Sequence, residues 1–297
     1  MQQNNSKCGY IAIVGRPNVG KSTLLNHLIG KKISIITPKP QTTRNQILGI
    51  KTIGNVQAVY IDTPGIHYTE KRAMNRYLNR LASAVIHDAD VIVFVIEALH
   101  WNREDDLVLQ KLMDVKKPVI LAINKVDTIK DKAKLLPFIQ RIQDKFAFAD
   151  IVPLSAKKSL NTSLCEEIIM NKLPENPHFF SEEQFTDKSE FFQAAEIIRE
   201  KLIQATEQEL PYSTTVTIDE FKQSSKRLEI SAIIWVEREG QKAIVIGKGG
   251  LLLKKIGTQA RKDIEKLFNK NVFLNLWVKV KNDWTDDEKA LQTLGFT

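Results

Sequence analysis

Eight residues near the N-terminus limit the possible folds of this chain more than any other stretch: GRPNVGKS, from Gly15 to Ser22. They fit the pattern G-x-x-x-x-G-K-[ST], in which backbone N–H groups of a glycine-rich loop surround phosphate oxygens. An apolar run over residues 10–14 precedes the loop, and residues 23–29 follow it with helical periodicity. A strand, a glycine loop and a helix N-terminus in this order favour a phosphate site over a chance turn.

The pattern assigns a role to the end of the loop. Lys21 is expected to reach the β and γ phosphates of a nucleotide, and Ser22 to offer its hydroxyl to Mg²⁺. The whole stretch is predicted to bind the nucleotide, through Gly15, Arg16, Pro17, Asn18, Val19, Gly20, Lys21 and Ser22.

A polar loop with two prolines, residues 38–44, contains the run QTTR. In phosphate-loop proteins a threonine of such a loop can bind the Mg²⁺. The sequence does not distinguish Thr42 from Thr43 for this role, and a threonine pair is often only part of a loop. Beyond it, apolar-rich residues 46–53 and 56–61 flank Gly54-Asn55, which predicts a β-hairpin.

The second strand of that hairpin leads into the run DTPG. An aspartate at the end of a strand that faces the phosphate loop can hold Mg²⁺ through a water, and the glycine N–H can contact a γ phosphate. A plain turn is the alternative. The predicted nucleotide contacts here are Asp62, Thr63, Pro64, Gly65 and Ile66. Isoleucine cannot orient an attacking water as glutamine would, so hydrolysis is either slow or uses another group.

The run NKVD, residues 124–127, is predicted to select the base of the bound nucleotide. Asp127 can accept hydrogen bonds from N1–H and the exocyclic amine of guanine, whereas adenine would present a lone pair to the carboxylate. We expect the stem of Lys125 to cover the base plane and Asn124 to brace the phosphate loop. The motif predicts guanine contacts from Asn124, Lys125, Val126 and Asp127.

Ser155 and Ala156 follow a short apolar run at residues 151–154, and the Ala156 N–H can donate to guanine O6 there. Helical periodicity and continuous apolar runs predict the remaining elements of this domain. Helices are expected at residues 69–86, 105–115, 131–148 and 164–173, and buried strands at 91–96 and 118–123. Together with the hairpin they predict an α/β domain with a mostly parallel six-stranded sheet.

The motifs GRPNVGKS, QTTR, DTPG, NKVD and SAK, in this order, resemble the Ras-like GTPase superfamily and, within it, the Era-type branch. The resemblance implies hydrolysis of GTP to GDP with Mg²⁺ as cofactor, and Lys21, Gly65 and Asn18 as catalytic residues. The implied metal ligands are Ser22, Thr42 or Thr43, and Asp62. Relatives with asparagine at the position of Asn18 can bind K⁺ there; a side chain that only hydrogen-bonds loop backbone is the alternative.

Residues 173–181 contain two prolines and no periodicity, which predicts a linker that continues to residue 189. Beyond it, helices are expected at residues 190–209 and 251–268, and strands at 213–218, 228–236 and 272–280. The order α-β-β-α-α-β, with G-x-x-G between two helices, resembles a type II KH domain, an α+β fold in which the helix before the glycines would be very short. We therefore divide the chain into a GTPase domain (1–173), a linker (174–189) and a KH domain (190–297).

The run GKGG is a weak motif alone, since a helix-start turn can contain such glycines. Because its glycines have no side chains, however, the loop lets a nucleic-acid backbone approach two helix ends. Residues 240–281 hold ten basic and two acidic residues. The net charge of this window, +8, equals the net charge of the whole chain. A solvated helix face would explain a charge run taken alone, but with the strand order we predict single-stranded RNA binding. The predicted RNA contacts are Gly247, Lys248, Gly249, Gly250, Lys254, Lys255 and Arg261.

The joined GTPase and KH halves resemble Era-type GTPases over almost the whole chain, including the runs VEREGQK, IGKGG, ARKDIE and LWVKVKNDW. The resemblance implies a GTP-controlled factor in the maturation of the small (30S) ribosomal subunit, with a KH domain that binds 16S rRNA near its 3′ end. It also implies a monomer in the cytoplasm, with weak peripheral association with the inner face of the cell membrane.

Composition agrees with a cytoplasmic protein. No stretch approaches the roughly 18 uncharged apolar residues of a membrane-spanning helix, the N-terminus lacks the apolar core of a secretion signal, and Cys8 and Cys165 are expected to be free thiols. Two alternatives stay open. A metabolic kinase that uses ATP would leave NKVD and the second domain unexplained. A GTPase whose C-terminal domain docks a protein or membrane partner would leave the G-x-x-G loop unexplained.

Overall fold

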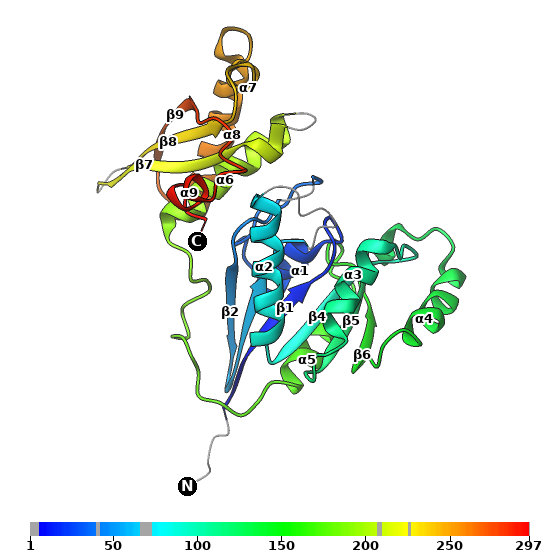
Figure 1. Ribbon diagram of the computed structural model, residues 1–297. Helices are drawn as coiled ribbons and strands as arrows, with labels where there is room; N and C mark the ends of the chain where they lie inside the picture. The colour runs from blue at the N-terminus through cyan, green and yellow to red at the C-terminus, as the bar shows by residue number, and fades with distance from the viewer. Residues whose placement is uncertain (1–5, 40–41, 66–72, 207–209, 225–226, 297) are drawn as a thin grey trace. The chain divides into compact units, whose positions relative to one another are not determined.

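The computed structural model describes residues 6–39, 42–65, 73–206, 210–224 and 227–296. Its described residues form two compact units. The first holds residues 6–34, 43–65 and 75–187, and the second holds residues 35–39, 42, 73–74, 188–206, 210–224 and 227–296. Figure 1 shows the elements of both units along the chain.

A twisted sheet forms the centre of the first unit, with the strand order β2-β3-β1-β4-β5-β6 among the described residues. Its strands are β1 (Lys7–Val14), β2 (Ile47–Ile53), β3 (Val56–Asp62), β4 (Val91–Glu97), β5 (Val119–Asn124) and β6 (Asp150–Pro153). Only β2 is antiparallel to its neighbour within this sheet, which confirms the predicted hairpin and the mostly parallel sheet. Because β1, β3, β4 and β5 are parallel, their carboxyl ends meet at one edge, where α/β sheets bind ligands.

Helices cover both faces of this sheet. They are α1 (Lys21–Ile29), α2 (Ala73–Asp88), α3 (Arg103–Leu112), α4 (Leu135–Gln143) and α5 (Thr162–Asn171). Buried side chains of α2, α3 and α4 share one apolar cluster with β4 and β5, while α1 packs near α5; Figure 1 shows α2 and α3 in front of the sheet.

Several helix boundaries differ from the sequence prediction; the helix expected at 164–173, for example, covers Thr162–Asn171. The helix expected at 105–115 begins at Arg103, because Asn102 caps it through a capping box, and it ends at Leu112. The helix expected at 131–148 begins with a 3-10 turn (Lys132–Lys134), and α4 covers only Leu135–Gln143. Pro137 has no N–H to donate to the preceding turn, so the α-helical ladder cannot extend further toward the N-terminus. The expected start of α2 at residue 69 lies outside the described residues.

The predicted linker has no regular helix or strand in its described residues, but most of it belongs to the first unit. The Phe185 carbonyl accepts from the N–H of Ile50 at 3.0 Å. The side chain of Gln57 accepts from Phe179 N–H and Phe180 N–H and donates to the Phe180 carbonyl. This segment therefore runs along the sheet as an ordered strap up to residue 187.

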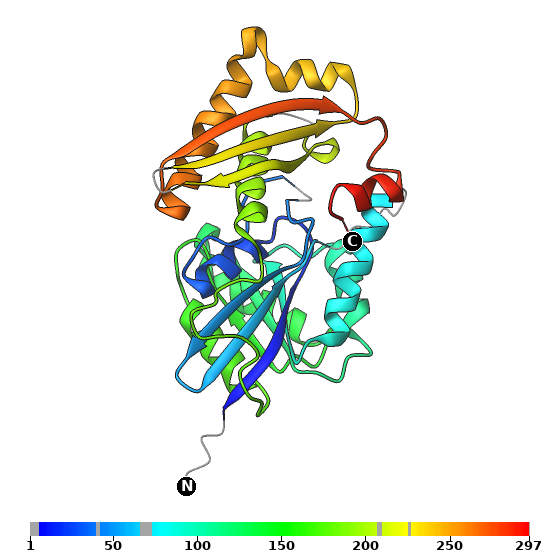
Figure 2. The ribbon, with the colours of Figure 1, turned by 90° about the vertical axis from the view of Figure 1, so that its left-hand side faces the viewer.

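The second unit has the predicted order α-β-β-α-α-β. It consists of α6 (Glu190–Ala205), β7 (Thr215–Gln223), β8 (Leu228–Val236), α7 (Glu239–Ile246), α8 (Leu251–Phe268) and β9 (Val272–Val280), followed by α9 (Glu288–Thr293), which the sequence did not predict. The sheet order is β7-β8-β9, with β8 antiparallel to β7 and parallel to β9. Helices α6 and α8 pack on one face of the sheet; in Figure 2 the strands lie in front of them.

The loop between α1 and β2 contributes residues to both units. Residues 35–39 and 42 belong to the second unit. There the Arg199 guanidinium, which is paired with Glu196, donates to the Thr42 carbonyl, and Glu200 accepts from the Ile36 N–H at 3.2 Å. The next residue, Thr43, belongs to the first unit.

Candidate functional site

The phosphate loop connects β1 to α1 and needs glycine at two positions. Gly15 has φ of 151° and Gly20 has φ of 100°. A Cβ atom on Gly15 would lie 2.3 Å from the Val95 carbonyl oxygen, and one on Gly20 would lie 2.3 Å from Asn124 Nδ2. The loop can therefore pack against β4 and β5 only without side chains at these positions.

The side chain of Lys21 contacts the backbone of this loop. Its Nζ donates to the carbonyl oxygens of Gly15 and Arg16, at 2.9 Å each. Burial lowers the pKa of Lys21 to about 8, although the negative charge of Asp62 opposes this. A buried cation at a helix N-terminus is suited to a phosphate group, which supplies the negative charge that burial demands.

Asp62, at the end of β3, is the centre of a cluster of hydroxyl groups. Its Oδ2 accepts from Ser22 Oγ and Ser34 Oγ, at 2.8 Å each, and lies 3.4 Å from Thr43 Oγ1. Burial raises the pKa of Asp62, which the hydrogen bonds of Ser22, Ser34 and Thr43 and the charge of Lys21 partly offset.

The other carboxylate oxygen of Asp62, Oδ1, is buried and has no hydrogen-bond partner among the described residues. A buried acceptor without a donor is costly. Mg²⁺ takes carboxylate, hydroxyl and water oxygens as ligands, so a bound Mg²⁺ would satisfy this group. The residues present therefore fit the magnesium site that the sequence predicts.

The geometry separates the two candidate threonines. Thr43 Oγ1 lies 3.0 Å from Ser22 Oγ and so joins the Asp62 cluster. Thr42 Oγ1 lies 2.5 Å from Thr37 Oγ1 and donates to the Lys39 carbonyl, so its hydroxyl lies outside the cluster. Ser34, which belongs to the cluster, was not among the predicted ligands.

The run DTPG lies against the phosphate loop. Thr63 Oγ1 donates to the Ile13 carbonyl at 2.8 Å. A Cβ on Gly65 would lie 2.8 Å from the backbone nitrogen of Pro17, so only glycine allows this approach. The Gly65 backbone therefore lies against Pro17 of the phosphate loop, while Ile66 lies outside the described residues.

Asn124 ties the base-binding loops to the phosphate loop. Its Nδ2 donates to the Val19 carbonyl at 2.8 Å, which agrees with the bracing role that we expected. Its Oδ1 accepts from the N–H groups of Lys125 at 2.8 Å and Ala156 at 3.0 Å. The Ala156 N–H, which we expected to donate to guanine O6, donates to this side chain here.

Asp127 is held in place by Ser155, whose Oγ lies 2.5 Å from Asp127 Oδ1. The preceding residue, Val126, is buried and donates its N–H to the Leu154 carbonyl. Ser155 leaves the second carboxylate oxygen of Asp127 to a ligand, and a carboxylate oriented in this way can accept from the two guanine donors.

An ion-pair network, which the sequence did not predict, connects the two nucleotide loops. Glu97 ends β4, and its Oε2 lies 2.9 Å from Lys125 Nζ and 3.2 Å from Arg16 Nη2. Arg16 Nε also contacts the buried Asp105 at 3.2 Å. The sequence held one signal for Glu97: it directly follows the apolar run at residues 91–96, and the carboxyl ends of parallel strands meet at one edge.

In the second unit, the GKGG run forms the predicted connection between two helices. Helix α7, expected to be very short, has eight residues. Gly247 has φ of 71°, and a Cβ there would lie 2.7 Å from Leu252 Cβ. Gly249 and Gly250 also have positive φ, but their Cβ positions have no heavy atom within 4 Å. The outer side of the loop is therefore open to a ligand.

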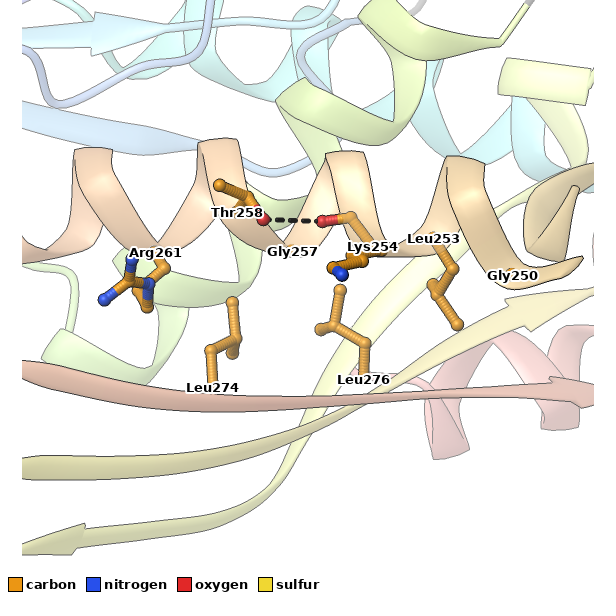
Figure 3. Close-up of a pocket in the computed structure, with 8 residues that line it drawn as sticks. All are labelled: Gly250, Leu253, Lys254, Gly257, Thr258, Arg261, Leu274 and Leu276. Atoms are coloured by element: carbon orange, nitrogen blue, oxygen red, sulfur yellow. Dashed lines mark hydrogen bonds between the residues drawn. The ribbon is translucent and has the colours of Figure 1, made fainter.

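A groove of about 370 Å³ lies beside this loop, between α8 and β9. Leu274 and Leu276 point from β9 toward α8, whose Lys254 and Arg261 line the same groove (Figure 3). Gly257 lies in the middle of the groove wall and has no side chain. A Cβ at this position would lie 3.3 Å from Leu276 Cδ1, which is a tight contact. An apolar floor with basic walls suits nucleic-acid bases and their phosphates. Of the predicted RNA contacts, three line the groove (Gly250, Lys254 and Arg261) and four do not (Gly247, Lys248, Gly249 and Lys255).

Two protein-family models match parts of this chain. A family model described as a 50S ribosome-binding GTPase matches residues 10–125, and a model of the KH domain matches residues 209–285. The GTPase Era of Pseudomonas fluorescens is 55% identical over 98% of this chain and 97% of its own length. The GTPase Era of Pseudomonas aeruginosa is 53% identical over 98% of this chain and 95% of its own.

The chain belongs to the Era family of GTPases.

Solved structures of Era-family proteins extend this likeness to the fold. Era in complex with MgGDPNP and nucleotides 1506–1542 of 16S ribosomal RNA has a TM-score of 0.95 and 41% identity, covering 98% of this chain and 99% of its own. A single-residue variant of Aquifex aeolicus Era bound to GDP and AlF4⁻ has the same TM-score and 40% identity, over the same shares of the two chains. The P-loop GTPase fold with a KH domain, predicted from the motifs, is confirmed, and the chain is a GTP-hydrolysing enzyme.

No helix among the described residues is long and apolar enough to cross a membrane.

Proposed function

We propose that this GTPase binds single-stranded 16S ribosomal RNA through the groove beside Gly249 and acts in assembly of the small ribosomal subunit. The groove carries the proposal, because an apolar floor, basic walls and a glycine-rich loop occur together there. The Era structure that contains nucleotides 1506–1542 of 16S ribosomal RNA supports the choice of RNA.

In the nucleotide site, Lys21 and the amides of the phosphate loop would hold the β and γ phosphates, and Asp127 would select guanine. Ser22, Thr43 and Asp62 would hold Mg²⁺, and the Era complex with MgGDPNP supports this choice of metal. When bound, Mg²⁺ would neutralise charge on the phosphates. The Gly65 N–H, next to Pro17, would contact the γ phosphate and lose that contact after hydrolysis.

Asn18 is the proposed K⁺ ligand. It has a left-handed backbone conformation with φ of 64°, and its side chain is exposed at the loop. None of the described residues forms a hydrogen bond with that side chain, which argues against a purely structural role. A cation there would supply the positive charge that an arginine finger supplies in other GTPases.

Arg199 would connect the nucleotide state to the second unit. It holds the Thr42 carbonyl, while the hydroxyl of the neighbouring Thr43 lies in the Asp62 cluster. A change in the position of Thr43 around Mg²⁺ and GTP would therefore also move the backbone of Thr42, which Arg199 of α6 binds. A change of nucleotide would in this way alter the RNA-binding unit, which is the switch that we propose.

The proposed partners follow from this function: GTP and GDP, the 3′ end of 16S rRNA and the small ribosomal subunit, for a monomer in the cytoplasm. The basic residues between 240 and 281 would also support weak attraction to anionic lipid at the inner face of the cell membrane. If the groove instead docked a protein, its basic walls would have no phosphates to contact.

RNA binding by a loop variant tests this function. Gly249→Asp places a carboxylate in the open side of the loop, and Gly54→Asp is its matched control. Gly54 has φ of 57° against 58° for Gly249, and neither Cβ position has an atom within 4 Å. We expect Gly249→Asp, but not Gly54→Asp, to abolish binding of RNA 1506–1542. The affinity of the wild-type protein for this RNA should fall steeply as the salt concentration rises. Equal affinities for the two variants would overturn the proposal.

A further inference from the structure

The outer face of β9 carries a row of exposed side chains that no helix of the second unit covers in the described structure. Because side chains alternate along a strand, Leu274 and Leu276 point into the groove while their neighbours point to the opposite face. These outward residues are Phe273, Asn275, Trp277 and Lys279, and all four are exposed. Trp277 is 63% exposed and Phe273 is 50% exposed, although large aromatic side chains are usually buried.

Basic side chains lie beside the aromatic rings of this face. Lys279 Nζ is 6.0 Å from the ring centroid of Trp235 on β8, and Arg227 Cζ is 5.6 Å from that of Phe273. The nearby carboxylates of Glu229 and Glu220 are paired with Arg227 and Lys222, respectively. These two carboxylates are therefore neutralised locally, and Lys279 adds a positive charge beside the rings.

Strand β9 is an edge strand, since the sheet order is β7-β8-β9. The groove and the outer face are thus the two sides of one strand, joined across an open edge. In Figure 2 β9 runs along the edge of the sheet. A chain that leaves the groove across this edge would meet the outward side chains of β9, among them Trp277.

We propose that the outer face of β9 is a second contact for the single-stranded RNA held in the groove, with bases stacked on Trp277 and Phe273. This rests on the proposed RNA binding by the groove. Exposed aromatic rings with amide and basic side chains between them form stacking surfaces in single-strand binders. Four residues of strand separate the two rings by about 13 Å, so each ring holds a different base.

The groove contacts only a short part of a long RNA. A G-x-x-G loop clamps about four nucleotides. The outer face therefore extends the site to nucleotides beyond those four, and it should add affinity only for RNA that is long enough to cross the edge of the sheet.

The test compares RNA 1506–1542 of 16S ribosomal RNA with a set of four-nucleotide pieces that cover it. Trp277→Ala should weaken binding of the long RNA by roughly five- to hundredfold and leave the affinity of the best four-nucleotide piece unchanged. Leu136→Ala on α4 is the control, because Leu136 is also 63% exposed, and it should bind both RNAs as wild type does. The long RNA, but not the four-nucleotide pieces, should also quench the tryptophan fluorescence of the wild-type protein. Trp277→Ala should remove this quenching.

Wild-type affinity of Trp277→Ala for the long RNA would overturn the proposal if Gly249→Asp still abolishes binding. If Trp277→Ala changes only self-association, measured by sedimentation, the face is a contact between two copies, which also overturns it. Failure of the wild-type protein to bind any of these RNAs would instead reject the proposed function itself.

Discussion

Arg16 and Lys125, one in the phosphate loop and one in the base-binding loop, contact the same carboxylate oxygen of Glu97. The distances from Glu97 Oε2 are 3.2 Å to Arg16 Nη2 and 2.9 Å to Lys125 Nζ. Glu97 therefore fixes the side chain expected to cover the guanine ring relative to the loop that binds the phosphates.

Neutralising Glu97 should weaken nucleotide binding without changing base selectivity. In Glu97→Gln both cations lose their shared anion, so the two loops lose part of their mutual orientation. Because the network is partly exposed, we expect a loss of about 1 kcal/mol, or roughly fivefold in GDP affinity. Isothermal titration calorimetry measures this. Glu167→Gln, at an exposed position of α5, is the control; equal affinities for both variants would remove the proposed role of Glu97.

The same network predicts a loss of stability in acid. Partial burial of Glu97 opposes ionisation, but the hydrogen bond and charge of Lys125 and the charge of Arg16 hold its pKa below the usual 4.5. Since the unfolded state binds the proton more readily, the stabilisation is present above pH 4.5 and is lost as the pH falls through the lower folded-state value. Thermal unfolding should show wild type more stable than Glu97→Gln at pH 7 and the difference shrinking below pH 4.5. A constant difference would contradict this.

Asp127→Asn should exchange GTP for xanthosine triphosphate. The asparagine amide can donate to the C2 carbonyl of xanthine, whereas guanine would place its amine against it. We expect GTP affinity to fall at least about hundredfold and affinity for xanthosine triphosphate to rise. Competition binding with both nucleotides measures the exchange, and unchanged GTP affinity would mean that Asp127 does not read the base.

The sequence predicts long buried elements better than the contacts of the site. Strands β8 and β9 match their predicted bounds, because apolar runs and strict alternation are local properties of the chain. By contrast, Ser34 and Glu97 reach the site through loop closure and sheet register. Thr42 and Thr43 are adjacent residues of a loop without periodicity, so only the folded backbone distinguishes their hydroxyls.

Potassium should accelerate GTP hydrolysis relative to sodium at equal ionic strength. We expect a severalfold effect with wild type and none with Asn18→Gly. Glycine tolerates the φ of 64° at this position, so the variant removes the side chain without straining the loop. Initial rates of phosphate release in KCl and NaCl measure the effect. Identical rates for the wild-type enzyme would exclude K⁺ as its activator.

The most direct test of the switch is the affinity of the intact protein for RNA 1506–1542 with Mg²⁺ and a non-hydrolysable GTP analogue, compared with Mg²⁺ and GDP. The loop that contains Thr42 and Thr43 is held by Arg199 at one residue and joins the Asp62 cluster at the next. We therefore predict tighter RNA binding in the GTP-analogue state, and a smaller difference in Arg199→Met. Equal affinity of the wild-type protein in both states would contradict the proposed coupling between GTP hydrolysis and RNA binding.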